Sequence, residues 1–188
     1  MKAIRRLHNH FPVLCLAIAM GASPSWGQNA DKIDSLYQRL GQAMDAAQAE
    51  RIAAELVIER TKSGSPAIDL LYQRGNQSLA QGDTEAAIDH LTALLDHAPD
   101  FIPARDARAA AYFLSGQTGP ALADLAAVLV AEPRDYEAII GLAEILEETG
   151  HTEQALAAYR QAAAIHPWLE EISTAIERLD QQLAGQRI

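Results

Sequence analysis

Identical residues recur along this chain with a period of 34, and this period limits the possible folds more than any other feature of the sequence. Four sets of residues share the period: Gly82, Gly116 and Gly150; Thr84, Thr118 and Thr152; Ala87, Ala121 and Ala155; and Pro99, Pro133 and Pro167. A repeat of this length is typical of stacked arrays, in which each unit is one supersecondary element that packs against its neighbours. The sequence therefore predicts three tandem copies of one unit.

The four sets indicate that each unit is a pair of helices. The glycines would end the first helix, because glycine adopts the left-handed backbone of a helix C-terminus without steric cost. The threonines follow two positions later, where a hydroxyl can accept a hydrogen bond at the N-cap of the second helix. The prolines would stop the second helix. The alanines, together with Gly75, Ala109 and Ala143, are expected where the two helices approach closely.

With this period and these residues, the chain resembles the tetratricopeptide repeat, a helix-turn-helix unit of about 34 residues. The resemblance implies an all-α fold, a tetratricopeptide-type α-solenoid of stacked antiparallel helix pairs. The three repeats would span residues 68–101, 102–135 and 136–169.

Three charged residues of the middle repeat bear on this resemblance. Arg105 stands where the family carries a large apolar residue early in the first helix, so its packing role departs from the pattern. Arg108 and Asp124 match a pair that forms an internal salt bridge in many members of the family. We therefore expect Arg108 to be structural rather than a ligand contact.

Helical segments flank the repeats on both sides. Residues 28–67 carry a weaker echo of the period, with Gly41 and Ala53 each lying one period before a small position of the first repeat. This segment is expected to be an N-terminal helical hairpin or a degenerate repeat. Residues 170–188 are expected to form a C-terminal capping helix, because an apolar stripe runs through otherwise polar sequence at Ile172, Ile176, Leu179 and Leu183.

Residues 1–27 have the pattern of a secretory signal peptide. Three bases, Lys2, Arg5 and Arg6, precede an apolar run at 11–22, and small or turn-forming residues follow. The run is shorter than the ~20 residues of a membrane span. We therefore expect cleavage after Gly27, no stable membrane anchor afterwards, and a protein of the periplasm or one that is secreted. The only cysteine would leave with this segment.

Charge and motif content exclude several classes of function. The whole chain carries 15 bases against 25 acids, a net charge of -10, and removal of residues 1–27 leaves 12 bases against the same 25 acids, a charge of -13. This balance argues against nucleic-acid binding. His90 and His97 lack a third ligand at suitable spacing, and His151 and His166 are expected at the surface. With no phosphate-binding glycine loop or nucleophile elbow, we expect no catalytic residue, metal ligand or cofactor.

The resemblance places function on the inner face of the superhelix, which the first helices line. The positions that would face this groove are Asp69, Tyr72, Asn76, Leu79, Asp106, Ala110, Phe113, Glu137, Ile140, Glu144 and Glu147. Aromatic, apolar and amide side chains at one end suit an extended peptide or a partner helix, although Leu79 and Phe113 could equally pack between repeats. The acidic end suits a basic segment or is a solvated face.

The leading hypothesis is a non-enzymatic interaction scaffold or adaptor of the bacterial envelope, which binds a peptide or protein segment in the groove. The alternative is a structural or oligomerising subunit of an envelope or secretion complex that uses other helix faces. The sequence leaves the partner and the oligomeric state open.

Overall fold

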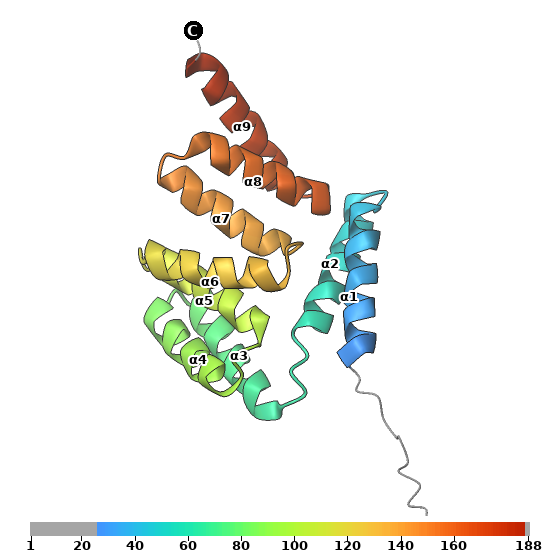
Figure 1. Cartoon of the computed structure of the whole chain (residues 1–188), viewed down its shortest axis with the longest axis vertical. Coiled ribbons are helices and arrows are strands. Elements are labelled where there is room, and N and C mark those ends of the chain that lie inside the picture. Colours follow the sequence, from blue (N-terminus) through green and yellow to red (C-terminus); the bar gives the residue numbers. More distant parts are fainter. Residues whose placement is uncertain (1–25, 187–188) are drawn as a thin grey trace, which may run out of the picture.

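The computed structural model describes residues 26–186, and the regular elements in this range are all α-helices (Figure 1). In chain order they are α1 (Trp26–Gly41), α2 (Ala46–Arg60), α3 (Pro66–Ala80), α4 (Thr84–His97), α5 (Ile102–Leu114), α6 (Thr118–Ala131), α7 (Tyr136–Glu148), α8 (Thr152–Ile165) and α9 (Glu170–Gln186).

Helices α3 to α8 form three antiparallel hairpins that stack one upon another. Within the hairpins α3 packs on α4, α5 on α6 and α7 on α8, while α4 contacts α5 and α6 contacts α7 between successive hairpins. Helix α9 packs on α8 and buries Ile172 and Leu179 there. The prediction of an all-α solenoid of stacked helix pairs is confirmed.

The glycines at the hairpin turns have the left-handed backbone that the sequence predicts. Gly82, Gly116 and Gly150 have φ values of 75°, 76° and 78°. Within the first hairpin, Gly75 is needed for close approach, because a Cβ atom there would lie 2.6 Å from the Leu91 side chain. The two helices could not keep this separation with a larger residue.

The predicted capping role of the threonines is wrong by one position. Helix α4 begins at Thr84 itself, and the cap is Asp83, whose carboxylate accepts a hydrogen bond from the Ala86 amide at 3.0 Å. Thr118 and Thr152 likewise open α6 and α8, and the residues before them form no side-chain cap bond. Each threonine is therefore the first residue of its helix, and the N-cap is the residue before it.

The expected ion pair of the middle hairpin is present. Arg108 donates to the two carboxylate oxygens of Asp124 at 2.7 and 2.9 Å, and also to the Thr92 hydroxyl at 3.1 Å. Arg105 lies 3.6 Å from the same Asp124 carboxylate and donates to the carbonyl oxygen of Pro99 at 3.0 Å. Arg105 therefore replaces the family's apolar contact with polar contacts to Asp124 and to the preceding loop.

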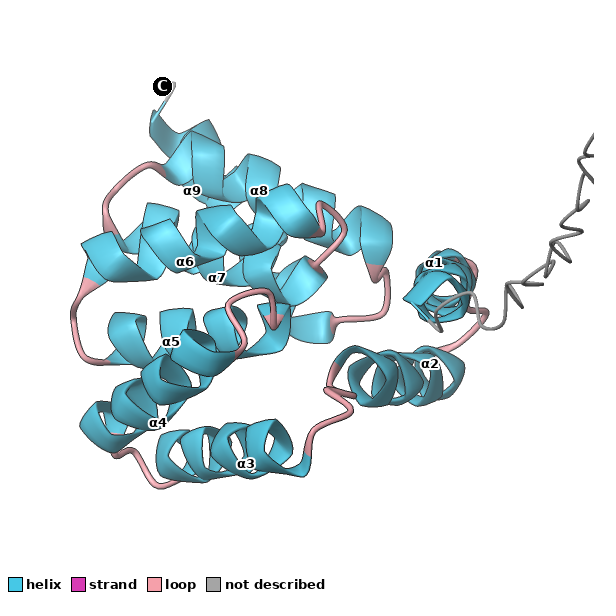
Figure 2. Cartoon of the chain, turned by 60° about the horizontal axis from the view of Figure 1, so that its bottom comes forward, coloured by secondary structure: helices cyan, strands magenta, loops and turns pink. Residues whose placement is uncertain are grey.

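The N-terminal hairpin of α1 and α2 does not stack on the first repeat as a fourth repeat would. It stands beside the stack (Figures 1 and 2), and α1 packs against α8. Leu36, Leu40 and Leu56 are at most 1% exposed, in a cluster shared with Ile139 of α7 and Ala155 of α8. The hairpin thus shares a hydrophobic core with the third repeat, which is distant in sequence.

The predicted signal peptide lies outside the described residues except for its last two, Trp26 and Gly27, which open α1. Among the described helices, none has the length and apolar character that crossing a membrane requires.

Candidate functional site

A cavity of about 1230 Å³ occupies the inner face of the stack. Helices α3, α5 and α7, the first helices of the three hairpins, form its floor, and the segment that joins α8 to α9 contributes His166, Trp168 and Leu169 at one end. Helix α2 forms a further wall. The cavity is therefore a groove enclosed by the repeats on one side and by the N-terminal hairpin on another.

Nine of the eleven residues predicted for the groove line this cavity, namely Tyr72, Asn76, Leu79, Asp106, Ala110, Phe113, Glu137, Ile140 and Glu144. Asp69 does not, because it lies at the start of α3, where it accepts a hydrogen bond from Ser63. Glu147 also lies away from the cavity and pairs with Arg178 of α9. The repeat register thus places most of the inner positions, whereas Asp69 and Glu147 lie outside the cavity and have polar contacts with Ser63 and Arg178.

Sequence reasoning missed the wall that α2 provides. Ala46, Glu50, Ala53 and Val57 line the cavity. Their spacing of four, three and four positions puts them on one side of a helix. A helical stripe on this segment is visible in the sequence, but the side that would face the groove depends on how the hairpin docks.

Several predicted groove side chains are held in place by their own surroundings. The ring of Tyr72 meets Phe101 edge-on, with 5.4 Å between ring centroids, and burial raises the pKa of its hydroxyl. The side-chain amide of Asn76 donates to the Tyr72 carbonyl oxygen at 3.1 Å. The Asn76 side chain also forms a hydrogen bond with the Tyr72 hydroxyl, which opposes the rise in the pKa of that hydroxyl. The side-chain oxygen of Asn76 therefore remains available to a ligand backbone.

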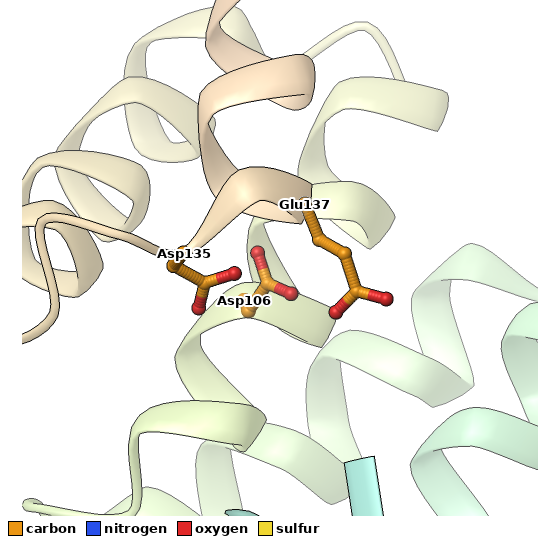
Figure 3. A group of neighbouring side chains, drawn as sticks. All are labelled: Asp106, Asp135 and Glu137. Atoms are coloured by element: carbon orange, nitrogen blue, oxygen red, sulfur yellow. The ribbon is translucent and has the colours of Figure 1, made fainter. Parts of the chain in front are cut away.

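Three carboxylates gather where α5, α7 and the turn before α7 meet. Asp106, Asp135 and Glu137 point toward a common space (Figure 3), with one oxygen of each within 4.8 Å of the others. Arg60 of α2 donates to both oxygens of the fully buried Asp135, once at 3.1 Å, and its guanidinium lies 3.7 Å from Glu137. The network therefore sets three carboxylates against one cation.

Asp106 is the carboxylate in this network without a hydrogen bond or ion pair among the described residues. Burial raises its pKa to about 7, and the nearby Asp135 and Glu137 act in the same direction. Burial also raises the pKa of Glu137. Three carboxylates at these distances are a candidate metal-ligand set that sequence analysis did not name, but the Arg60 guanidinium already occupies the cation position beside Asp135.

A second acidic group lies at the other end of the groove. Glu144 of α7 lines the cavity together with Glu170 and Glu171 of α9. Burial raises the pKa of Glu144, and the negative charge of Glu171 adds to the effect. With Glu50 of α2, six carboxylates line the cavity, and no lysine or arginine of the described chain does so.

His166 is buried rather than exposed as predicted. It is 4% exposed and packs edge-on against Tyr136, with 5.1 Å between ring centroids. Burial lowers its pKa, and its Nδ1 atom has no hydrogen-bond partner within the described structure. The error arises because its position before Pro167 predicts an exposed loop, whereas this loop packs against Tyr136 of α7, and its Trp168 donates to the Ala43 carbonyl oxygen of the N-terminal hairpin at 2.8 Å.

The tetratricopeptide-repeat profile matches residues 69–100 and 137–167, which correspond to the first and third hairpins. A TPR repeat-containing protein of Rhizobium etli is 30% identical over 156 residues, which is 83% of this chain and 76% of that protein. This chain belongs to the tetratricopeptide-repeat family. Such repeats generally mediate interactions between proteins, and the fold is typically a non-enzymatic scaffold.

Solved structures show the same fold at lower sequence identity. The first TPR domain of the human RPAP3 protein is 22% identical, with a TM-score of 0.59 over 64% of this chain and 95% of that domain. TTC0263, a thermophilic TPR protein of Thermus thermophilus, is 17% identical, with a TM-score of 0.54 and 82% of each chain covered. Both likenesses concern the tetratricopeptide-repeat fold alone.

Proposed function

We propose that this tetratricopeptide-repeat protein holds a segment of a partner protein in the groove between its repeats and its N-terminal hairpin. The observation that carries the proposal is the composition of that cavity. Tyr72, Phe113 and Ile140 supply apolar contact area from three successive hairpins, and carboxylates surround them. Apolar contact area with a few polar groups at its margin is the arrangement by which binding grooves recognise protein segments.

The size of the groove supports a short segment rather than a whole domain. A helix with a diameter of about 10 Å and a rise of about 1.5 Å per residue fills ~120 Å³ per residue. The cavity of about 1230 Å³ would then hold roughly ten helical residues.

A variant that fills the groove tests this proposal. Ala110 lines the cavity from α5 and is solvent-exposed, so Ala110→Trp should block the groove without disturbing the core. Ala157→Trp is the matched control, because Ala157 is exposed on α8 away from the cavity. We expect Ala110→Trp to lose partners that the wild type and Ala157→Trp both capture from an envelope extract. Identical capture by all three proteins would refute groove binding.

We also propose that the protein acts in the bacterial envelope after removal of residues 1–27. The charge and apolar pattern of that segment supports export. N-terminal sequencing of the protein purified from a periplasmic fraction should begin at Gln28. Recovery of the full-length chain from the cytoplasm alone would contradict the proposal.

Self-association through α6 is the second candidate, and one observation favours it. The exposed residues of α6 include Leu122, Ala123, Ala126 and Val130, and no charged residue of this helix is exposed. The Val130 side chain is the most exposed of the large apolar side chains of this helix, at 84%. Light scattering should then show an oligomer that Val130→Glu converts to a monomer. A monomeric wild type would remove this candidate.

A further inference from the structure

The acidic lining indicates what the groove would take as its occupant, provided that the groove binds a protein segment at all. We propose that the partner segment is a short amphipathic helix with two lysine or arginine side chains about two helical turns apart, on the same side as an apolar residue. One cation would lie opposite Asp106 and Glu137, and the other opposite Glu144 and the start of α9.

The first end of the groove has more negative charge than the protein itself compensates. Arg60 donates to both oxygens of Asp135 and so is already committed to that residue. Glu137 lies 3.7 Å from the same guanidinium, and Asp106 forms no ion pair in the described structure. Arg60 is one positive charge against three carboxylates, so a cation brought by a partner would still meet an excess of negative charge at Asp106 and Glu137.

The second end has the same sign and also lacks an internal cation. Glu144, Glu170 and Glu171 line the cavity there, and within the described residues none of them forms a salt bridge. The neighbouring Glu147 differs, since it is paired with Arg178 outside the cavity. At this end of the groove, the carboxylates that line the cavity therefore have no ion-pair partner in the described structure, whereas the carboxylate of Glu147 beside it is paired.

The distance between the two ends follows from their positions on one helix. Glu137 and Glu144 are two turns apart on α7, which corresponds to about 10.5 Å along the helix axis. Ile140 and Gly141 lie between them and also line the cavity. The groove therefore presents an acidic, an apolar and a second acidic stretch in sequence.

A helical partner can match this order. Its residues i and i+7 lie on one side and are also about 10.5 Å apart, so lysines at these positions would reach both acidic ends. An apolar residue at i+3 or i+4 would then lie over Ile140. The six carboxylates of the lining, with no lysine or arginine of the described chain among them, favour such a cationic helix over an acidic or neutral one.

Two synthetic peptides of identical composition test the inference. Both are fluorescein-labelled, capped, alanine-based helices of ~15 residues with two lysines and one leucine. In one peptide the lysines are at i and i+7, and in the other at i and i+4. Fluorescence anisotropy at ~0.05 M and ~0.15 M salt measures binding to the wild type. We expect the i,i+7 peptide to bind about tenfold more tightly than the other, and more tightly at the lower salt concentration.

Paired variants of the protein complete the test. Asp106→Asn with Glu144→Gln should weaken binding of the i,i+7 peptide about tenfold and remove the preference for its spacing. The matched control is Asp89→Asn with Glu177→Gln, which removes two exposed carboxylates that do not line the cavity. Circular dichroism melts establish that both double variants are folded.

Equal binding of the two peptides, equal effects of the two double variants, or no binding of either peptide would each overturn the inference. If Ala110→Trp still abolishes partner capture in that case, groove binding stands and the two-cation helix alone is refuted. If Ala110→Trp has no effect on capture either, the proposed function falls with it.

Discussion

Arg60 of α2 reaches far along the chain to Asp135, and its guanidinium donates to both carboxylate oxygens of that residue. The Arg60 side chain is 10% exposed and the Asp135 side chain is fully buried. The pair joins the last turn of α2 to the turn before α7. It thereby fixes the N-terminal hairpin against the third repeat and sets α2 as a wall of the groove.

Removal of Arg60 should be far more damaging than removal of an exposed arginine. Arg60→Ala leaves Asp135 buried without its cation, with two further carboxylates close by, and we expect a loss of about 3–5 kcal/mol in the free energy of unfolding. Arg160, whose ion pair with Asp180 is half-exposed, is the matched control. Its replacement by alanine should cost less than ~1 kcal/mol. Similar urea midpoints for the two variants would contradict the structural role given to Arg60.

Asp106 should make the protein less stable as the pH rises. The unfolded carboxyl loses its proton near pH ~4, whereas in the folded protein its pKa is about 7. Between these pH values the Asp106 carboxyl is protonated more fully in the folded state than in the unfolded state. The free energy of unfolding therefore falls as the pH rises, and this decrease is complete above pH ~7. Burial is the main cause of the raised pKa, the charges of Asp135 and Glu137 add to it, and the charge of Arg60 opposes it.

Asp106→Asn should therefore raise the free energy of unfolding at pH ~8 by ~1–4 kcal/mol and have little effect at pH ~4. Urea unfolding at both pH values measures the difference. A variant that is less stable than the wild type at pH ~8 would show that the Asp106 carboxylate has a stabilising partner.

The space around two glycines predicts opposite effects of their replacement by alanine. Gly75→Ala should destabilise by ~1–3 kcal/mol, because its Cβ would meet the buried Leu91 side chain. Gly119 of α6 has no atom within 4 Å of the corresponding position, so Gly119→Ala should be neutral or stabilising by up to about 1 kcal/mol. Thermal denaturation compares the two. A stabilising Gly75→Ala would indicate that α3 can move away from α4 at no cost.

The cap of α4 separates the predicted from the observed role of two neighbouring residues. Asp83→Ala should cost ~1 kcal/mol, because the Ala86 amide loses its carboxylate acceptor. Thr84→Ala should cost less than about half of that, since the Thr84 side chain caps nothing. Urea unfolding of both variants at neutral pH measures the contrast. A larger loss for Thr84→Ala would restore the assignment of Thr84 as the cap.

The repeats and most of the groove could be predicted because their determinants are local or periodic. A glycine with positive φ, such as Gly116, and a small residue at each helix contact mark the hairpins in the sequence itself. Once the register is known, the inner positions of α3, α5 and α7 follow from it. The capping error has a local cause too, since Asp83 stands one position earlier with a better acceptor.

The remaining features depend on contacts between segments that are distant in sequence. The wall formed by α2 exists because Leu36, Leu40 and Leu56 pack into the core of the third repeat, and no spacing in the sequence records that docking. The carboxylate network likewise unites α5, the turn before α7, and α2. Burial of His166 has the same origin, because covering segments decide it rather than its own neighbours in the chain.

Photo-crosslinking in cells tests the central claim, that a partner segment lies between the repeats and the N-terminal hairpin. A photoreactive amino acid is placed at Ala110 on α5, at Ala53 on α2, or at Ala157 on α8; the first two line the cavity and the third does not. We predict that the same partner is crosslinked from positions 110 and 53 and not from 157. Crosslinks to a partner from position 157 alone, with none from the two walls of the groove, would contradict the account.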